Sequence, residues 1–208
     1  YNNSPLDMDG HRIYIKDGDT VWNPGWQPTK TPLDSYSCRH GLGYTVVEGK
    51  KDGVTARQEL FVPKGDACEL DRVTVCNESA AVKELDLFSY VEFCLWDAVD
   101  DSSNFQRNYS TGEVEVEGSV IYHKTEYRER RNHYAVFWAN CPVDSFDTTR
   151  DAFCGVYGGP ADPQAVRAGH CSGSIAHGWA PVGALHIHLS LAPGESRSIL
   201  FGLGYIEN

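Results

Sequence analysis

The chain has 208 residues, of which 23% are charged and 41% hydrophobic, and its formal net charge is −11 at pH 7. This composition is typical of a soluble globular protein. The acidic balance argues against nucleic acid or an anionic membrane as the main partner, because both require a basic footprint, whereas a neutral ligand such as a sugar is compatible with it. No run of 18 apolar residues occurs, so no membrane-spanning helix is expected.

Short segments of β-strand character follow one another along the chain, separated by turns rich in Gly, Pro, Asn and Asp. Each segment alternates apolar and polar residues or is rich in β-branched side chains. Asp52-Gly53 suits a tight hairpin, and Pro193-Gly194 predicts that the last two strands form an antiparallel pair. The predicted strands cover residues 11–16, 44–48, 54–62, 70–76, 83–94, 112–117, 119–123, 133–138, 185–191 and 198–205.

Strands at intervals of roughly ten residues, with almost no helical periodicity, predict an all-β fold. We expect one large antiparallel β-sandwich that spans residues 1–208 as a single domain, since sandwiches of this length do not require a second core. Residues 155–183 are rich in Gly and Pro and are predicted to be loop, without a domain boundary.

Seven cysteines form an odd set without a close Cys-x-x-Cys pair, so the spacing predicts neither a disulfide framework nor a zinc knuckle. Most are expected to be buried thiols, and a reducing cytoplasm is the expected compartment. The cysteines are Cys38, Cys68, Cys76, Cys94, Cys141, Cys154 and Cys171.

Four segments mix aromatic residues with hydrogen-bonding groups: residues 19–28, 38–44, 97–108 and 124–133. A sugar presents apolar C–H faces and a rim of hydroxyls, so a sugar site combines aromatic platforms with Asp, Asn, Gln, Arg and His. Each of these segments is therefore a candidate for carbohydrate binding.

Two of the segments allow a structural interpretation as readily as a functional one. Trp22 and Trp26 lie between prolines, where they can anchor a packed loop or provide sugar platforms. Arg39 and His40 precede a Gly-Leu-Gly turn, where the Arg can form an ion pair or belong to a site.

The charged segments favour structural roles. Arg128, Arg130 and Arg131 alternate with glutamates, which favours a salt-bridge ladder over an anion site. The acidic residues 97–101 lack the spacing of a calcium loop, so no metal is expected there. Phosphate-binding loops, Gly-x-Ser-x-Gly elbows and His-Glu-x-x-His helices are absent from the sequence, and paired catalytic carboxylates cannot be assigned without spatial information.

Read together, these segments resemble the cellobiose-phosphorylase-type enzymes of glycoside hydrolase family 94. The similarity is colinear over nearly the whole chain, which makes it far more specific than a single short motif. The segments that carry it include Trp22-Asn-Pro-Gly-Trp26-Gln-Pro, Cys38-Arg-His-Gly-Leu-Gly-Tyr-Thr45, Phe88-Ser-Tyr-Val-Glu-Phe93, Asn104-Phe-Gln-Arg-Asn108, Tyr122-His-Lys-Thr-Glu-Tyr-Arg-Glu-Arg-Arg-Asn-His133 and Phe201-Gly-Leu-Gly-Tyr205.

The resemblance implies an N-terminal β-sandwich of the supersandwich type, followed in the whole enzyme by an (α/α)6 barrel that carries the catalytic aspartate. It implies phosphorolysis of cellobiose with inversion, in which inorganic phosphate is the co-substrate and no other cofactor is used. No catalytic residue is then expected within residues 1–208. The isolated chain is expected to be inactive.

The resemblance also implies a homodimer in which a loop of the sandwich reaches the active site of the neighbouring subunit. Residues 104–108 match this loop. Gln106 and Arg107 are expected to bind hydroxyls of the transferred glucosyl unit, and Phe105 is expected to form the pocket wall. A free-standing carbohydrate-binding module and a purely structural interface domain are the alternatives, because sandwiches host many functions.

Overall fold

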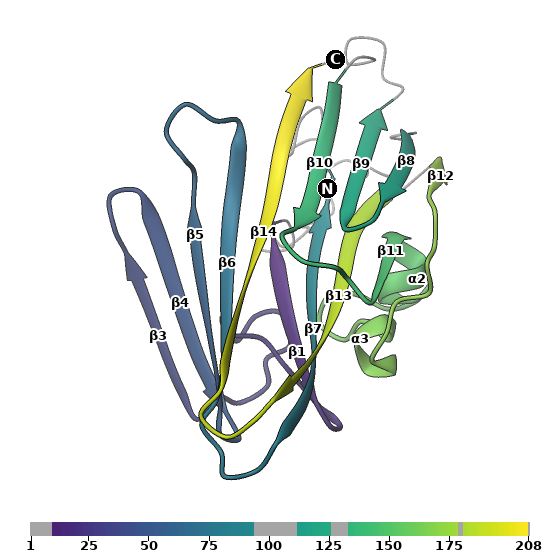
Figure 1. Cartoon of the computed structure of the whole chain (residues 1–208). Coiled ribbons are helices and arrows are strands. Elements are labelled where there is room, and N and C mark those ends of the chain that lie inside the picture. Colours follow the sequence, from purple (N-terminus) through teal and green to yellow (C-terminus); the bar gives the residue numbers. More distant parts are fainter. Residues whose placement is uncertain (1–9, 94–111, 126–132, 179–180, 208) are drawn as a thin grey trace, which may run out of the picture.

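The computed structural model describes residues 10–93, 112–125, 133–178 and 181–207. These residues form two antiparallel β-sheets and two short helices (Figure 1). The smaller sheet contains β1 (Arg12–Asp17), β2 (Thr20–Trp22), β7 (Lys83–Glu92), β11 (Ser145–Thr149) and β13 (Pro181–Leu191). The larger sheet contains β3 (Ser35–His40), β4 (Tyr44–Lys51), β5 (Val54–Phe61), β6 (Cys68–Asn77), β8 (Gly112–Glu117), β9 (Val120–Thr125), β10 (His133–Ala139), β12 (His177–Gly178) and β14 (Ser196–Glu207). The helices are α2 (Arg150–Cys154) and α3 (Gln164–Ala168).

The order of the strands within the sheets differs from their order in the chain. The smaller sheet has the order β11-β13-β7-β1-β2, and the larger has the order β12-β8-β9-β10-β14-β6-β5-β4-β3. All described pairings are antiparallel. The predicted all-β antiparallel sandwich is therefore confirmed, and each of the predicted strands is present.

The predicted hairpin at Asp52-Gly53 is confirmed. Asp52 and Gly53 have φ angles of 48° and 77°, and Lys51 of β4 faces Val54 of β5. A turn with positive φ at both central residues matches the twist of the strands it joins, which explains the preference for Asp-Gly here.

The predicted pairing of the last two strands is wrong. β13 pairs with β11 and β7 in the smaller sheet, whereas β14 pairs with β10 and β6 in the larger one. Pro193 and Gly194 therefore turn the chain from one sheet to the other. Alternation and turn residues indicate strands and a reversal, but they do not tell whether the second strand joins the same sheet.

The prediction that residues 155–183 are loop is also wrong in part. This segment contains α3 and β12, and β13 begins at Pro181. Each helix is five residues long, which is too short for a helical period to be visible in the sequence. The helices cover part of the outer face of the smaller sheet, where Phe153 and Val166 pack with Tyr14, Phe88 and Tyr90.

The main core lies between the two sheets. Val73 and Val75 of β6 and Leu85 and Leu87 of β7 are completely buried there. Each such side chain contributes roughly 1.5–3 kcal/mol by leaving water. Trp22 also belongs to this core, with 0% exposure.

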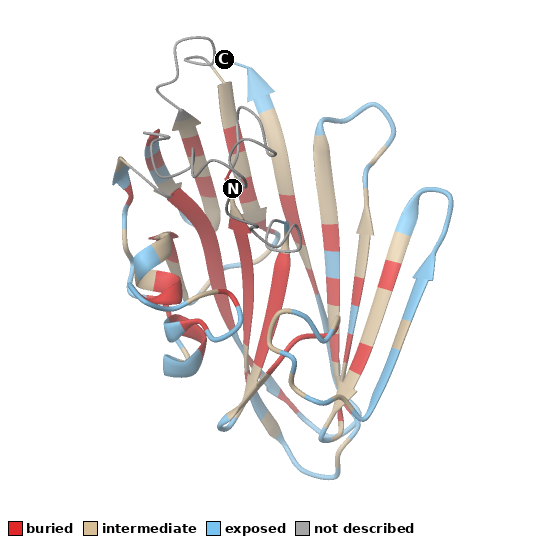
Figure 2. Ribbon diagram, turned by 180° about the vertical axis from the view of Figure 1, so that it is seen from behind, coloured by how far each residue is buried: buried red, intermediate tan, exposed pale blue. Residues whose placement is uncertain are grey.

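One end of the larger sheet extends beyond the smaller sheet. Strands β3 to β5 fan outward at this end (Figure 1), and β3 is exposed along most of its length (Figure 2). Lower on β4, the loop after β2 lies against the sheet: a Cβ on Gly49 would come within 2.6 Å of the Pro24 carbonyl oxygen. The sheet is thus covered near Gly49 and open near its tip.

The cysteines differ from the expectation that most are buried. Cys154 and Cys171 are buried and Cys38 is exposed, while Cys68, Cys76 and Cys141 are intermediate, and all six are free thiols. Within the described ranges, no helix is long and apolar enough to cross a membrane.

Candidate functional site

A shallow depression of about 410 Å³ lies at the open end of the larger sheet. We call it the tip depression. It includes the Gly-Leu-Gly turn between β3 and β4, one of the segments with sugar-binding composition. Its lining consists of Gly41, Leu42, Gly43, Tyr44, Thr45, Leu60, Phe61, Val62 and Glu69.

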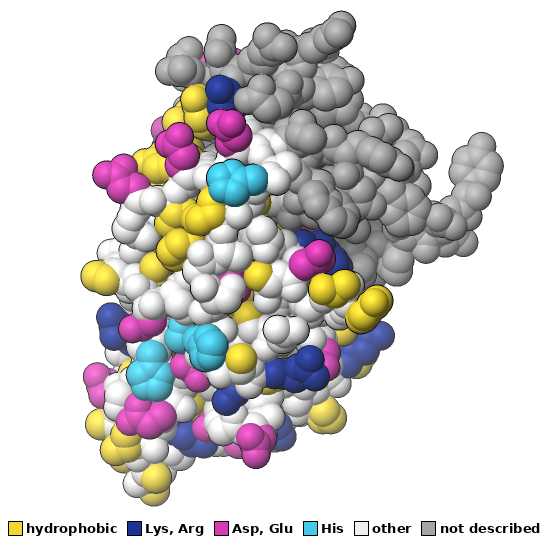
Figure 3. Space-filling view, turned by 90° about the vertical axis from the view of Figure 1, so that its right-hand side faces the viewer, with side chains coloured by type: hydrophobic (Ala, Val, Ile, Leu, Met, Phe, Trp, Pro, Cys, Tyr) yellow, Lys and Arg dark blue, Asp and Glu magenta, His cyan; other side chains and the backbone are white. Residues whose placement is uncertain are grey.

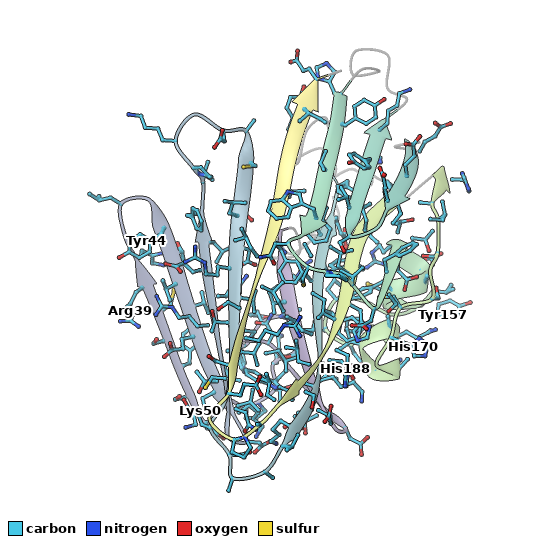
Figure 4. The ribbon with its side chains drawn as sticks, viewed as in Figure 1. Arg39, Tyr44, Lys50, Tyr157, His170 and His188 are labelled. Carbon is cyan, nitrogen blue, oxygen red and sulfur yellow. The ribbon has the colours of Figure 1, made fainter. Side chains whose placement is uncertain are left out.

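The aromatic part of the depression is a cross-strand pair. Tyr44 of β4 lies directly opposite Phe61 of β5, so both side chains are on the same face of the sheet. The Tyr44 ring lies against the backbone of Gly41, where an added Cβ would come within 2.4 Å of a ring carbon. A glycine at position 41 therefore permits the observed position of the Tyr44 ring, half of which remains exposed (Figure 4).

Polar groups gather on the opposite face of the same strands. Thr45 of β4 is the cross-strand partner of Leu60 in β5 and of His40 in β3. His40 Nδ1 is 3.0 Å from the Thr45 hydroxyl, and His40 Nε2 is 3.5 Å from the Cys38 thiol. These contacts fix the orientation of the exposed His40 ring next to the depression.

Glu69 contacts a network of buried polar side chains. His11 Nε2 is 2.5 Å from Ser89 Oγ, and His11 Nδ1 is 3.7 Å from Glu69 Oε1 and 3.6 Å from Asp71 Oδ2. Gln58 donates a hydrogen bond of 2.8 Å to Asp71. The side chains of His11 and Asp71 are 2% and 0% exposed, whereas that of Glu69 is 40% exposed.

The buried carboxyl group in this chain has a displaced pKa. Burial raises the pKa of Asp71 from 3.8 to about 6, because a charged carboxylate loses its hydration in the core. The nearby His11 and the hydrogen bond from Gln58 oppose this rise. The Glu69 side chain is 40% exposed to solvent and also lines the tip depression, so it lies between the depression and the buried polar network.

The residues predicted to bind the glucosyl unit, Phe105, Gln106 and Arg107, lie outside the described residues, as do Arg128, Arg130 and Arg131 and the acidic residues 97–101. Trp22 is buried in the core, which supports its interpretation as a packed anchor, and Trp26 is 44% exposed. Across the described residues, no group of three or more His, Cys, Asp or Glu side chains is arranged to hold a metal ion.

Sequence reasoning missed the polar chain of His11, Asp71 and Gln58. A signal was present, because Asp71 precedes Val73 and Val75 at the inward positions of β6, and Gln58 follows Val54 and Ala56 at the inward positions of β5. A polar residue that continues a buried apolar face needs a partner inside the protein.

A second polar cluster lies on the outer face of the smaller sheet, on the side that carries α2 and α3. Figure 3 shows histidine and acidic side chains next to one another on this side. His186 and His188 of β13 both contact Asp86 Oδ1 at 3.0 Å, and His188 Nε2 is 3.0 Å from Glu84 Oε2. A neutral imidazole has a single N–H, so the two carboxylate contacts of His188 require the protonated ring.

Comparison with known proteins agrees with this architecture. Residues 1–208 match the family model described as glycosyl hydrolase 94, supersandwich domain. An N,N'-diacetylchitobiose phosphorylase from Vibrio proteolyticus is 35% identical over 210 residues, which cover 97% of this chain and 26% of the relative. A solabiose phosphorylase from Paenibacillus borealis is 37% identical over 197 residues, which cover 92% of this chain and 25% of the relative.

Among solved structures, a bacterial glucoamylase complexed with acarbose has a TM-score of 0.57 and 9% identity, over 95% of this chain and 27% of that chain, which is a likeness of fold alone. The chain spans about a quarter of the length of the curated relatives it matches. From the family match over residues 1–208 and the similarity to two phosphorylases, the chain belongs to the glycosyl hydrolase 94 supersandwich domain family.

Proposed function

We propose that this chain is the β-sandwich part of a glycoside phosphorylase that cleaves cellobiose with inorganic phosphate. The products are α-glucose 1-phosphate and glucose, formed with inversion. The observation that carries the proposal is the similarity of 35% and 37% to two disaccharide phosphorylases, over almost all of this chain.

The chemistry needs one carboxyl group as proton donor to the leaving sugar. Phosphate attacks from the opposite face and replaces both the water and the general base of an inverting hydrolase. In the proposal the donor belongs to the barrel of the whole enzyme. The sandwich contributes by orienting the sugar and excluding water.

Within the sandwich, the proposed contacts come from the connection between β7 and β8, which spans residues 93–111. Gln106 and Arg107 donate hydrogen bonds to hydroxyls of the transferred glucosyl unit, and Phe105 forms part of the pocket wall. A homodimer delivers this segment to the active site of the partner subunit. A long connection on a rigid sandwich is a common place for binding residues, which supports this assignment.

Cellobiose is proposed from the overall similarity of the motifs. Two relatives are named for N,N'-diacetylchitobiose and solabiose, so these two disaccharides are the alternative substrates to be compared with cellobiose. A cytoplasmic location is part of the same proposal. The six free thiols of the described residues are compatible with a reducing compartment.

The test is an assay of glucose 1-phosphate with the full-length protein, phosphate and a panel of cellobiose, N,N'-diacetylchitobiose and solabiose. We expect phosphorolysis of cellobiose and no turnover by the 208-residue chain alone. Turnover of another disaccharide would replace cellobiose in the proposal. Robust production of glucose 1-phosphate by the isolated chain would contradict the assignment of the proton donor to the barrel.

A further inference from the structure

We infer that His123 is a positioning residue, whose buried ring holds both ends of the connection between β7 and β8. This connection, residues 93–111, carries Gln106 and Arg107, the proposed partners of the glucosyl unit, so the inference rests on the proposed function. His123 acts on these residues through the ends of the connection and not through a contact with the sugar.

The His123 ring contacts the chain at both ends of this connection. At the first end, the Phe93 ring stacks on the imidazole, with ring centroids 4.9 Å apart and an angle of 20° between the ring planes. At the second end, the imidazole lies against Gly112, the first residue of β8, where an added Cβ would come within 2.4 Å of His123 Cε1. One side chain thus contacts the residue where the connection begins and the residue that follows its end.

The strand register explains how one ring reaches both ends. His123 lies on β9 opposite Val114 of β8 and Ala135 of β10, and the three residues are 3%, 5% and 6% exposed. Their side chains face the core between the sheets, to which Phe93 also belongs. Because β7 is in the smaller sheet and β8 in the larger one, the chain crosses between the sheets here, and His123 contacts both sides of the crossing.

Histidine is a costly residue at this position in the core. Burial lowers the pKa of His123 to about 4, although the Glu113 backbone opposes this shift, so the ring is neutral at pH 7. Its buried Nδ1 atom has no hydrogen bond of standard geometry within the described residues. A buried polar atom without a partner destabilises the fold. A polar residue that core packing does not favour indicates a role beyond stability.

Gly112 is matched to this ring. A Cβ at position 112 would also come within 3.1 Å of His123 Nδ1 and 2.7 Å of the Lys124 carbonyl oxygen, so a larger residue would displace the imidazole or the backbone of β9. The glycine therefore lets β8 begin in contact with the ring. A segment whose two ends are held by one packed ring keeps its binding residues in place, and a misplacement of about 1 Å can cost roughly 100-fold in rate.

The test is a double-mutant cycle in the full-length protein, with phosphorolysis of the disaccharide that the wild type accepts as the readout. His123→Ala should lower kcat/KM roughly ten-fold, because the connection is no longer held in place. In the Arg107→Ala background the same change should lower kcat/KM less than about three-fold, because the donor that it positions is already absent. A purely structural role of His123 would give equal losses in the two backgrounds, and this result would overturn the inference.

Val75→Ala is the matched control. It removes part of a completely buried side chain on β6, which β14 and β10 separate from β9, so kcat/KM should stay unchanged. If His123→Ala does not fold, Phe93→Leu replaces it, because this change removes the stacked ring and keeps an apolar side chain. Unchanged kcat/KM in the folded variant would also overturn the inference.

A second readout does not depend on catalysis. Limited digestion of the full-length protein with trypsin, followed by mass spectrometry, gives the rate of cleavage after Arg107. This rate should rise about three-fold or more in His123→Ala and stay at the wild-type value in Val75→Ala, because local release of a segment exposes it to proteases. An unchanged rate in His123→Ala would overturn the inference. A raised rate in a protein whose wild type shows no phosphorolysis would overturn the proposed function instead, and would leave the hold of His123 on the connection standing.

Discussion

His188 Nδ1 lies 3.0 Å from Asp86 Oδ1 across the β13–β7 strand pair. The hydrogen bond with Asp86 is the main cause of a raised pKa of His188, and burial of the ring opposes it. Glu84, on the other side of the ring, has a lowered pKa, to which hydrogen bonds from Ser190 and His188 contribute. The protonated ring and two carboxylates thus form a small pH-dependent ion-pair network on the sheet surface.

We predict that His188→Gln destabilises the protein near pH 6 and has no effect near pH 9. A histidine whose folded pKa is raised stabilises the fold fully below its ordinary pKa of 6.5, and this contribution is lost as pH rises through the folded value. The ring is 48% exposed, so the effect should be at most about 1 kcal/mol. Urea denaturation at the two pH values measures it, with His177→Gln, at an exposed position on β12, as the control. An equal loss at both pH values would show that packing, not charge, is involved.

Asp71→Asn should flatten the pH dependence of stability. The folded protein keeps a proton on Asp71 between its ordinary pKa of 3.8 and its folded pKa of about 6, whereas the unfolded chain releases it. Wild-type stability therefore falls as pH rises through this window, by up to about 3 kcal/mol from this group. The difference between wild type and Asp71→Asn, measured by chemical denaturation from about pH 4 to pH 7, should change by a similar amount. Curves that stay parallel, as expected for the exposed control Asp66→Asn, would contradict the raised pKa.

Gly49→Ala is predicted to cost about 1–3 kcal/mol of stability, because overpacking forces the structure to shift. The added Cβ would meet the backbone of Pro24 at 2.6 Å and 2.9 Å, and a backbone segment moves less easily than a side chain. Gly159→Ala is the matched control, since nothing lies within 4 Å of its Cβ position, and it should stay within about 0.5 kcal/mol of wild type. Equal thermal unfolding of the two variants would mean that the loop after β2 is not held against β4.

Delivery of the β7–β8 connection across a dimer can be tested by subunit mixing. Full-length Arg107→Ala, which is expected to keep roughly a hundredth of wild-type kcat/KM, is combined with a full-length variant that lacks the catalytic aspartate of the barrel and is expected to be inactive alone. A mixed dimer contains one complete site, so equal mixing should recover about a quarter of wild-type activity. Glucose 1-phosphate formation after mixing is the readout. A mixture that stays inactive although subunits exchange would place the segment in the site of its own subunit.

The sequence predicts most strands of this fold, because β4, β5, β6 and β7 alternate apolar and polar residues between recognisable turns. It does not predict β3, whose side chains are mostly exposed and follow no apolar period. It also does not predict that the last two strands lie in different sheets, because this depends on long-range pairing. Local residue patterns carry no information on such pairing.

The tip depression is predictable in part. The composition of residues 38–44 indicates a candidate site, but the pairing of Tyr44 with Phe61 requires the register of β4 and β5. His11 Nδ1 lies 3.7 Å from Glu69 Oε1, although the two residues are far apart in the chain and meet only in the folded sandwich. Such contacts between distant segments cannot be derived from one sequence.

The kinetics of Arg107→Ala in the full-length protein test the central claim most directly, namely that this sandwich supplies a sugar-binding residue to a phosphorylase. We predict that kcat/KM for phosphorolysis of cellobiose falls roughly 100-fold, the scale expected when a positioned donor is removed, while thermal unfolding is unchanged. Wild-type kinetics in a folded Arg107→Ala protein would contradict the account.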